Sequence, residues 1–344
     1  MLHSSALGRW FEFPDGKDGN RLTQTLGSTT TTYGYGAGSD LLQTMSVGGS
    51  VTQTVGYTAD GRMASFSPGL QSPSGQVTTA LSYNQDAQLS AVNDGTQVVA
   101  SYIYNGFGQR VLKAFPGGTG EIYQYGQNGM LLEETDQAGT PQADYIYLNG
   151  RPIATLNPAT GTLYYLQDDR LGTPQLATDS SQTVAWQAAY GPFGQASVSG
   201  SITQNLRFPG QYYDVETGWN HNGFRDYIPE LGRYAEPDPL GRLGSGNDLY
   251  GYVGDNPENF VDPLGLQKSC GCGTKHKNME IAQEEMPETP EEIEAKREQY
   301  ERERGLQPIT NPAKMGMVYD AMNPGPLPED IAKTFREPLK NSEL

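Results

Sequence analysis

The sequence contains little cysteine and histidine. Two cysteines, Cys270 and Cys272, and three histidines occur among 344 residues. Two cysteines cannot frame a disulfide-built fold, and so few histidines disfavour a histidine metal site. Cys270 and Cys272 with His276 could bind a soft metal, but the glycines around them favour a flexible linker. We therefore expect no cofactor and no metal.

Basic residues and long apolar runs are also scarce. The 23 lysines and arginines face 40 acidic residues, and the net charge of −17 disfavours nucleic acid as a partner. No run of about 18 apolar residues is present that could cross a membrane as a helix, so we expect no membrane span. The first residues lack the basic start and the apolar stretch of a secretory signal, so we expect no signal peptide.

Lysine is almost absent from most of the chain. Only Lys17 and Lys113 precede residue 267, and 37 of the first 266 residues are charged, against 26 of the last 78. Such a step in composition marks a domain boundary. We place this boundary directly after Leu266.

Glycine, proline and tyrosine are abundant instead. The 43 glycines and 23 prolines interrupt the chain at short intervals, which suits short strands and turns. Nine tyrosines before polar turns recur with a mean spacing of about 22 residues, as in repeat arrays. They are Tyr35, Tyr57, Tyr83, Tyr104, Tyr125, Tyr147, Tyr165, Tyr190 and Tyr212. The pattern predicts a mainly antiparallel β fold, with hairpin turns near residues 59–61, 84–87, 105–108, 126–129 and 148–150.

The tyrosines also predict how the hairpins pack. Tyr123 and Tyr125, like Tyr145 and Tyr147, stand two residues apart, so each pair lies on one face of its strand. One hairpin cannot bury such a face, whereas stacked neighbours can. A generic antiparallel β-protein is the alternative, but the persistence of the period through nine units favours a repeat array.

The last 78 residues differ in kind. Residues 291–304 read EEIEAKREQYERER, a run of strong helix formers, and Thr289-Pro290 can start a helix that Gly305 ends. Its apolar face is narrow, which favours a solvated linker helix over a partner-binding one. We expect a mostly helical or disordered tail that holds no turnover enzyme.

Residues 207–266 resemble the RHS repeat-associated core domain across their whole length, and the tyrosine units before them resemble YD, or RHS, repeats. The motifs that carry the likeness are Phe208-Pro-Gly-Gln-Tyr-Tyr-Asp214, Thr217-Gly218, Phe224-Arg225, Pro229-x-x-Gly-Arg-Tyr234, Asp238-Pro-Leu-Gly241, Asn247-x-Leu-Tyr250, Asn256-Pro257 and Asp262-Pro-Leu-Gly-Leu266. The resemblance implies an irregular start at 1–29, repeats at 30–206, the core domain at 207–266 and a variable tail, a truncated toxin region, at 267–344.

The resemblance also implies an architecture and partners. In this family the repeats form a hollow β-shell, the core domain plugs one end, and a variable carboxy-terminal domain, usually a toxin, is held inside. About 11 hairpin units fit here, too few to close a shell. We therefore expect the carboxy-terminal part of a bacterial polymorphic toxin, or a truncated copy. Its expected partners are an upstream repeat shell or delivery apparatus and an immunity protein, and its expected location is secreted, delivered or at the cell surface.

The family further implies self-cleavage by an aspartyl-type carboxylate pair. Carried over by motif, the residues are Asp226 and Asp238 with Arg225 beside them. The bond is Leu266–Gln267, at the end of the motif that contains Asp262, Pro263 and Gly265. Two close carboxylates cannot both ionise, so one can hold a proton while the other activates water. We expect their oxygens within about 4–6 Å of each other, the range in which charges shift each other's pKa.

Three functions compete at this point. The first is a toxin-delivery shell whose core domain cuts after Leu266 in a single turnover and releases the effector segment. The second is an inactive structural or cell-surface interaction module, in which the aspartates only open turns, as Asp-Pro steps often do. The third is a toxin enzyme in the tail.

Overall fold

The computed structural model describes residues 2–6, 9–13, 19–67, 79–95, 97–245 and 248–270. Spatial contacts divide the chain into two units, Met1–Ile103 with Gly108–Lys277, and Tyr104–Phe107 with Asn278–Leu344. The structure presented below is that of the first unit. The predicted helix at 289–304 lies outside the described residues, as do Asn247, Cys272 and His276.

Most of the described strands form one long antiparallel sheet, here called the repeat sheet, in which each strand pairs with the next one along the chain. Its strands are β3 (Thr23–Leu26), β4 (Thr29–Tyr35), β5 (Leu42–Val47), β6 (Ser50–Tyr57), β7 (Met63–Ser67), β8 (Thr79–Tyr83), β9 (Leu89–Asn93), β10 (Val98–Tyr104), β11 (Arg110–Phe115), β12 (Thr119–Tyr125), β13 (Leu131–Asp136), β14 (Pro141–Leu148), β15 (Arg151–Asn157), β16 (Thr162–Asp168), β17 (Pro174–Thr178), β18 (Val184–Tyr190) and β19 (Ala196–Gly200). The mainly β fold expected from the sequence is confirmed, and the described residues contain one short helix, α1 (Arg242–Ser245).

All five predicted hairpin turns are confirmed, since each falls between two paired strands or at their ends. Side chains at the first position stabilise several hairpin turns from within. The Oδ1 atom of Asn84 accepts hydrogen bonds from the backbone N–H groups of Asp86 (3.0 Å) and Gln88 (2.9 Å). Asp136 binds the N–H groups of Ala138 and Thr140 in the same way. Asn and Asp are therefore used here for their short acceptor side chains.

The repeating tyrosines link consecutive hairpins. The hydroxyl of Tyr83 donates to the carbonyl of Met63 at 2.7 Å, and that of Tyr125 donates to the carbonyl of Arg110 at 2.9 Å. Each acceptor is the first residue of a strand in the preceding hairpin. Each ring is at least half-buried while its hydroxyl satisfies a backbone group. This contact accounts for the tyrosine before the turn in the hairpins that contain Tyr83 and Tyr125.

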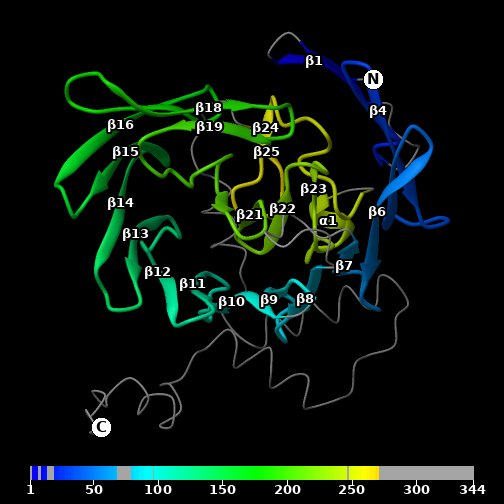
Figure 1. Ribbon diagram of the computed structural model, residues 1–344, viewed down its shortest axis with the longest axis horizontal. Coiled ribbons are helices and arrows are strands. Elements are labelled where there is room, and N and C mark those ends of the chain that lie inside the picture. The colour runs from blue at the N-terminus through cyan, green and yellow to red at the C-terminus, as the bar shows by residue number, and fades with distance from the viewer. Residues whose placement is uncertain are drawn as a thin grey trace, which may run out of the picture. The chain divides into compact units, whose positions relative to one another are not determined.

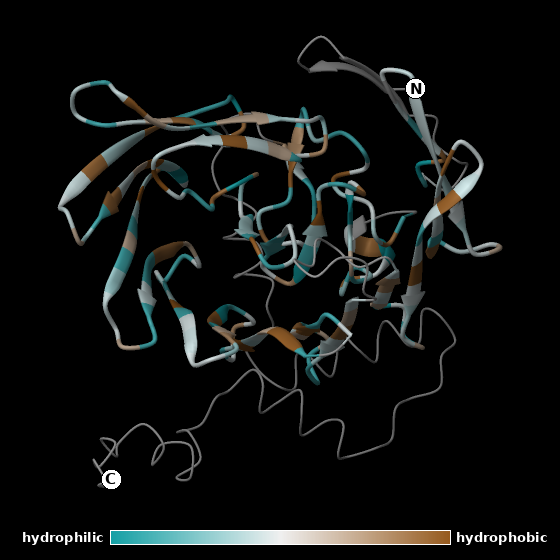
Figure 2. Cartoon of the chain, in the orientation of Figure 1, coloured by the Kyte–Doolittle hydropathy of each residue, from teal (hydrophilic) through white to brown (hydrophobic). Residues whose placement is uncertain are grey.

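A second sheet of four short strands lies within the curve of the repeat sheet (Figure 1) and is here called the plug sheet. Its strands are β20 (Tyr212–Asp214), β21 (Trp219–Asn222), β22 (Arg225–Ile228) and β23 (Arg233–Tyr234). Every residue of β21 and β22 is buried. Figure 2 shows apolar and polar residues mixed along the strands of both sheets, as strands with two different faces require.

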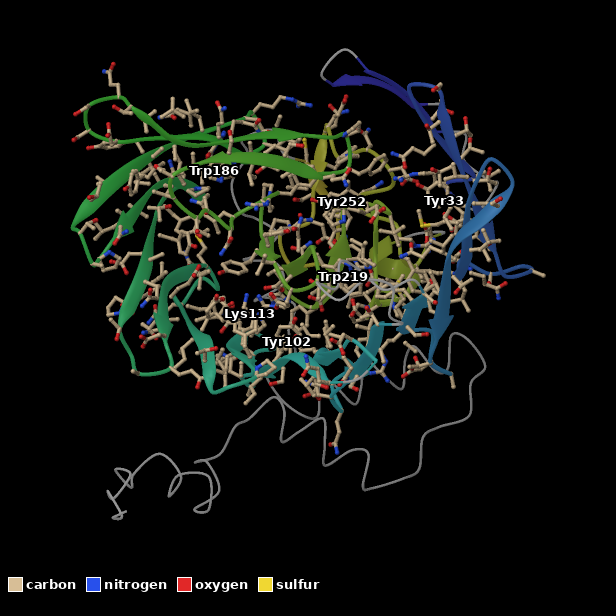
Figure 3. All side chains as sticks on the ribbon, in the orientation of Figure 1. Tyr33, Tyr102, Lys113, Trp186, Trp219 and Tyr252 are labelled. Carbon is tan, nitrogen blue, oxygen red and sulfur yellow. The ribbon has the colours of Figure 1, made fainter. Side chains whose placement is uncertain are left out.

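Aromatic side chains such as Tyr102 and Trp219 lie between the two sheets (Figure 3). Phe66 of β7 and Trp219 of β21 meet edge to face, with ring centroids 5.0 Å apart. Tyr123 of β12 packs in the same manner on Tyr212 of β20, at 5.3 Å. The predicted tyrosine pair Tyr123 and Tyr125 lies in one cluster around Tyr212. The repeat sheet therefore buries its tyrosine face against the plug sheet as well as against neighbouring hairpins.

Strands also occur where the sequence suggested irregular or separate segments. Residues 1–29 contain the paired strands β1 (Leu2–Ala6) and β2 (Arg9–Phe13) besides β3. Beyond Leu266, β25 (Ser269–Cys270) pairs antiparallel with β24 (Phe260–Val261). The first residues after the expected boundary are thus bound to the strand that precedes the Asp262 motif.

Candidate active site

Residues 262–267, here called the cleavage segment, lie against the β21–β22 hairpin. The backbone N–H of Phe224 donates to the carbonyl of Leu264 at 3.0 Å, and the Asn222 side chain donates to the carbonyl of Asp262 at 3.0 Å. Gly265 has φ +67°, and a Cβ on it would overlap the carbonyl oxygen of Asn222. Only glycine can combine that conformation with so close an approach. The glycine of the motif therefore fits the segment to the hairpin.

Arg225 connects the cleavage segment to Asp238. Its Nη2 lies 3.0 Å from Oδ2 of Asp238 and 3.3 Å from Oδ2 of Asp262, and its Nε donates to the carbonyl of Gly265 at 2.5 Å. The guanidinium also stacks on the ring of Tyr234, 3.7 Å from its centroid. A buried guanidinium needs such partners on several sides, because an unpaired buried charge is costly.

Asp238 and the carbonyl of Leu266 border the same small space beside Gly244 of α1. A Cβ on Gly244 would overlap the Leu266 carbonyl oxygen and lie 2.7 Å from Oδ2 of Asp238. Burial raises the pKa of Asp238, although the charge of Arg225 works in the opposite direction. The structure thus brings a buried carboxyl group close to the carbonyl of the Leu266–Gln267 bond.

Asp262 binds both backbone N–H groups around that bond. Its Oδ1 accepts from the N–H of Leu266 at 2.9 Å and from the N–H of Gln267 at 3.1 Å. Its Oδ2 accepts from the hydroxyl of Tyr234 at 2.9 Å. Asp262 is itself buried. The sequence motif placed Asp262 near the bond, but it did not indicate which groups its carboxylate binds.

Asp226 has a different set of contacts. It follows Arg225 on β22, and neighbouring residues of a strand point to opposite faces. Its Oδ1 lies 3.2 Å from Nδ1 of His221, and its backbone N–H donates to Glu236 at 2.8 Å. Burial and the charge of Asp226 raise the pKa of Glu236 well above its usual range. Arg225 and Asp238 are brought together as expected, while direct pairing of Asp226 with Asp238 stays a prediction.

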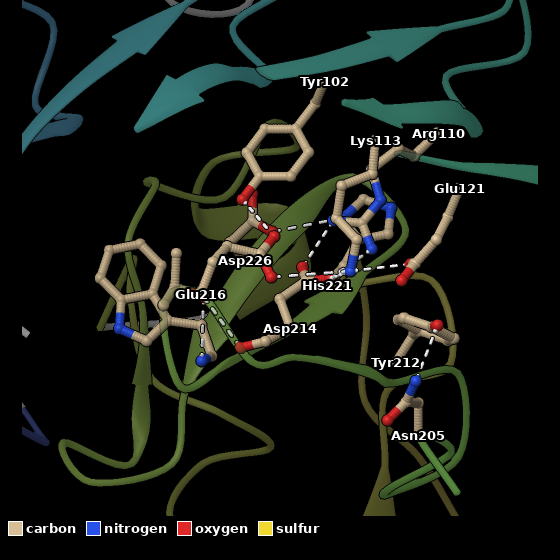
Figure 4. Close-up of polar contacts among 12 residues, drawn as sticks. Tyr102, Arg110, Lys113, Glu121, Asn205, Tyr212, Asp214, Glu216, His221 and Asp226 are labelled. Atoms are coloured by element: carbon tan, nitrogen blue, oxygen red, sulfur yellow. Dashed lines mark hydrogen bonds and ion pairs between the residues drawn. The ribbon is translucent and has the colours of Figure 1, made fainter. Parts of the chain in front are cut away.

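A buried ionic cluster, which sequence reasoning missed, joins the two sheets (Figure 4). Arg110 of β11 binds Asp214 of β20 with two hydrogen bonds of 2.5 and 2.8 Å. Lys113 of β11 lies 3.1 Å from Asp214 and 3.6 Å from Glu216. Burial raises the pKa of Asp214, but the charges of Arg110 and Lys113 outweigh it and bring the pKa down to about 2. Lys113 stands out as one of two lysines before residue 267, which is the signal that could have identified it.

The described residues hold neither a metal-site cluster nor a membrane-spanning helix. No group of three or more His, Cys, Asp or Glu side chains in these ranges has the arrangement of a metal site. No helix there is long and apolar enough to cross a membrane.

Part of the chain matches a known family. Residues 79–248 match the model of the Teneurin YD-shell family. The chain is an RHS (YD) repeat protein. Among curated relatives of this RHS protein, "Toxin protein Tse5" of Pseudomonas aeruginosa is 30% identical over 212 residues, which cover 50% of this chain and 16% of the relative. "Double-stranded DNA deaminase toxin A" of Burkholderia cenocepacia is 38% identical over 117 residues, which cover 32% of this chain and 8% of that toxin.

A solved structure similar to this RHS protein is that of a Photorhabdus luminescens Tc holotoxin pore with a mutant TccC3. It is 18% identical with a TM-score of 0.45, and the match covers 78% of this chain and 17% of that one. The RHS chain thus spans less than a fifth of the length of each relative named here.

Proposed function

We propose that this RHS protein belongs to a toxin-delivery shell and that its core domain hydrolyses its own Leu266–Gln267 bond. The observation that carries the proposal is that the Asp238 carboxyl group and the Leu266 carbonyl border the same space beside Gly244. Arg225 supports it, because the same guanidinium binds Asp238 and the carbonyl of Gly265. The reaction is a single-turnover, aspartyl-type autoproteolysis.

The proposed reaction needs one ionised and one protonated carboxyl group. The ionised group takes a proton from water as the water oxygen attacks the carbonyl carbon of Leu266. The bond from that carbon to the nitrogen of Gln267 then breaks, and the nitrogen leaves with a proton as a new amino terminus. Asp238 borders the same space beside Gly244 as this carbonyl, and Asp226, carried over from the family, is proposed as the second carboxyl group. The raised pKa of Asp238 supports its carrying a proton at higher pH than an ordinary aspartate.

The biological role is inferred from the relatives. Tse5 and the deaminase are both called toxins, so we infer that the segment after Leu266 leads into an effector. A delivery apparatus or further repeats of the shell, together with an immunity protein, would then be its partners. Delivery out of the producing cell follows from the same inference.

Substitution of Asp238 tests the proposed chemistry. Asp238→Asn keeps the size of the side chain but can neither accept the proton of water nor carry a proton to the leaving nitrogen. We expect wild-type protein to release residues 267–344 and Asp238→Asn to remain intact by mass spectrometry. Asp179→Asn is the control, because Asp179 caps an exposed turn and asparagine can also accept its hydrogen bonds. Equal release from Asp238→Asn and wild type would refute the role of Asp238, and an intact wild type would favour the structural module.

A further inference from the structure

The carboxylate of Asp262 binds backbone groups at the peptide bond that is proposed to be hydrolysed. One of its oxygens binds two consecutive N–H groups, those of Leu266 and Gln267, at 2.9 and 3.1 Å. The nitrogen of Gln267 is the leaving atom of the proposed reaction. Leu266 and Gln267 are the fourth and fifth residues after Asp262. The contact therefore fixes the number of residues between Asp262 and the bond.

The other oxygen of Asp262 is anchored to the plug sheet. It accepts from the hydroxyl of Tyr234 at 2.9 Å and lies 3.3 Å from Nη2 of Arg225. Asn222 binds the backbone carbonyl of Asp262 at 3.0 Å. Asp262 is 2% exposed, so these contacts are made away from solvent, where hydrogen bonds to a charged group are strong.

Further backbone contacts fix the register of the cleavage segment on the β21–β22 hairpin. The carbonyl of Leu264 accepts from the N–H of Phe224 at 3.0 Å, and Gly223 leaves no room for a side chain at that point because a Cβ there would lie 2.5 Å from the same carbonyl oxygen. The side chain of Leu266, in contrast, is only half-buried. The position of the bond is thus held by backbone contacts counted from Asp262 more firmly than by the side chain of Leu266.

We propose that Asp262 is a specificity-determining residue that sets which bond is cut, by counting: the bond hydrolysed is the one after the fourth residue that follows Asp262. This inference rests on the proposed self-cleavage. Asp262 does so by fixing the N–H groups on both sides of the reacting carbonyl. The identity of the fourth residue is then secondary.

Insertion of one leucine between Gly265 and Leu266 separates counting from side-chain preference. Two consecutive bonds then follow a leucine, the bond after the inserted residue and the original Leu266–Gln267 bond. We expect cleavage after the inserted leucine alone, so that the released fragment begins with Leu266 and is one leucine heavier than the wild-type fragment. The control carries one leucine inserted after Gln267, downstream of the bond, and should be cut after Leu266.

Mass spectrometry of the released fragment identifies the bond. A fragment that begins with Gln267, a mixture of both, or loss of cleavage in a variant whose far-ultraviolet circular dichroism is unchanged would each overturn the counting role. The wild-type chain reports separately on the proposed function, because its failure to cleave would remove both proposals. Cleavage of wild type with an unmoved site in the insertion variant would remove only this one.

Substitution of Asp262 supplies a second readout. Asp262→Ala removes both acceptors, and we expect the rate of release to fall by about 100-fold, as for a bond that is misplaced by about 1 Å. Asp262→Asn keeps one acceptor oxygen for the two N–H groups, so we expect a partial rate and cleavage at the unchanged bond. A rate in Asp262→Ala equal to that of wild type would overturn the proposal.

Discussion

At the scale of single residues, Gly244 holds open the space that the reaction needs. Its φ is not in the left-handed region, so an alanine there is strained only by its contacts. Those contacts are the Leu266 carbonyl and the carboxyl group of Asp238. A methyl group would therefore push apart the two groups that the proposal brings together.

We predict that Gly244→Ala slows release of residues 267–344 by about 100-fold, since misplacement by about 1 Å has effects of this size. The rate is measured from the intact-mass time course of the purified chain. Gly191→Ala is the matched control, because a Cβ on Gly191 meets its nearest atom only at an ordinary 3.7 Å. Undiminished release from Gly244→Ala would show that the space beside Gly244 is not used.

Asp214 of the plug sheet is expected to contribute strongly to the stability of the packing between the two sheets. Removing its carboxylate leaves Arg110 and Lys113 buried without their main counter-charge. We predict that Asp214→Ala lowers the free energy of unfolding by about 3–5 kcal/mol, the usual cost of breaking a buried pair. Urea denaturation of the purified protein measures it.

Asp60 provides the comparison for Asp214. It pairs with Arg62, but its side chain is 56% exposed. Asp60→Ala should change the free energy of unfolding by less than about 1 kcal/mol, as is usual for exposed ion pairs. Similar losses in both variants would mean that the buried cluster contributes no more than a surface pair.

At the scale of elements, the hairpins could be predicted from the sequence, whereas the side-chain contacts between the two sheets could not. Turns follow from Asn, Asp and Gly placed within a few residues of each other, as at Asn84, because the interactions that form them are local. Arg110 and Asp214 are 104 residues apart, and no local pattern pairs them. The alternation of Arg225 and Asp226 could have been foreseen only once residues 225–228 were recognised as a strand.

Strand β13 contains a carboxyl group that makes stability depend on pH. Burial raises the pKa of Glu134 to about 7 from an ordinary value of 4.5, and its carboxyl group is hydrogen-bonded to the hydroxyl of Tyr145. The folded state therefore binds this proton more tightly than the unfolded chain does. Its contribution to stability is complete below pH 4.5 and is lost as the pH rises through about 7, a change on the order of 3 kcal/mol.

We predict that Glu134→Gln flattens this part of the pH dependence. The free energy of unfolding of the wild type, compared with that of the variant, should fall between pH 4.5 and pH 8. Glu133→Gln, on the neighbouring residue of β13, serves as the control and should follow the wild type. Parallel curves for Glu134→Gln and wild type would contradict the assignment of a proton to Glu134 in the folded state.

At the scale of the whole molecule, the family resemblance and the structure account for different parts of the site. The resemblance supplied Arg225, Asp238 and the Leu266–Gln267 bond, because these belong to ordered motifs in 60 residues. The contacts of Asp262 and Gly244 depend on how residues 262–267 lie on the β21–β22 hairpin, which the sequence does not specify. The plug sheet that carries the site is held in place by contacts with strands β7, β11 and β12 of the repeat sheet.

The central claim is that the core domain itself hydrolyses the Leu266–Gln267 bond. The most direct measurement is the intact mass of the purified chain after incubation without any added protease. The account predicts that the 37.4 kDa chain is converted into two products with the masses of residues 1–266 and 267–344, and that Asp238→Asn remains whole. A wild-type chain that persists as a single 37.4 kDa species would contradict it.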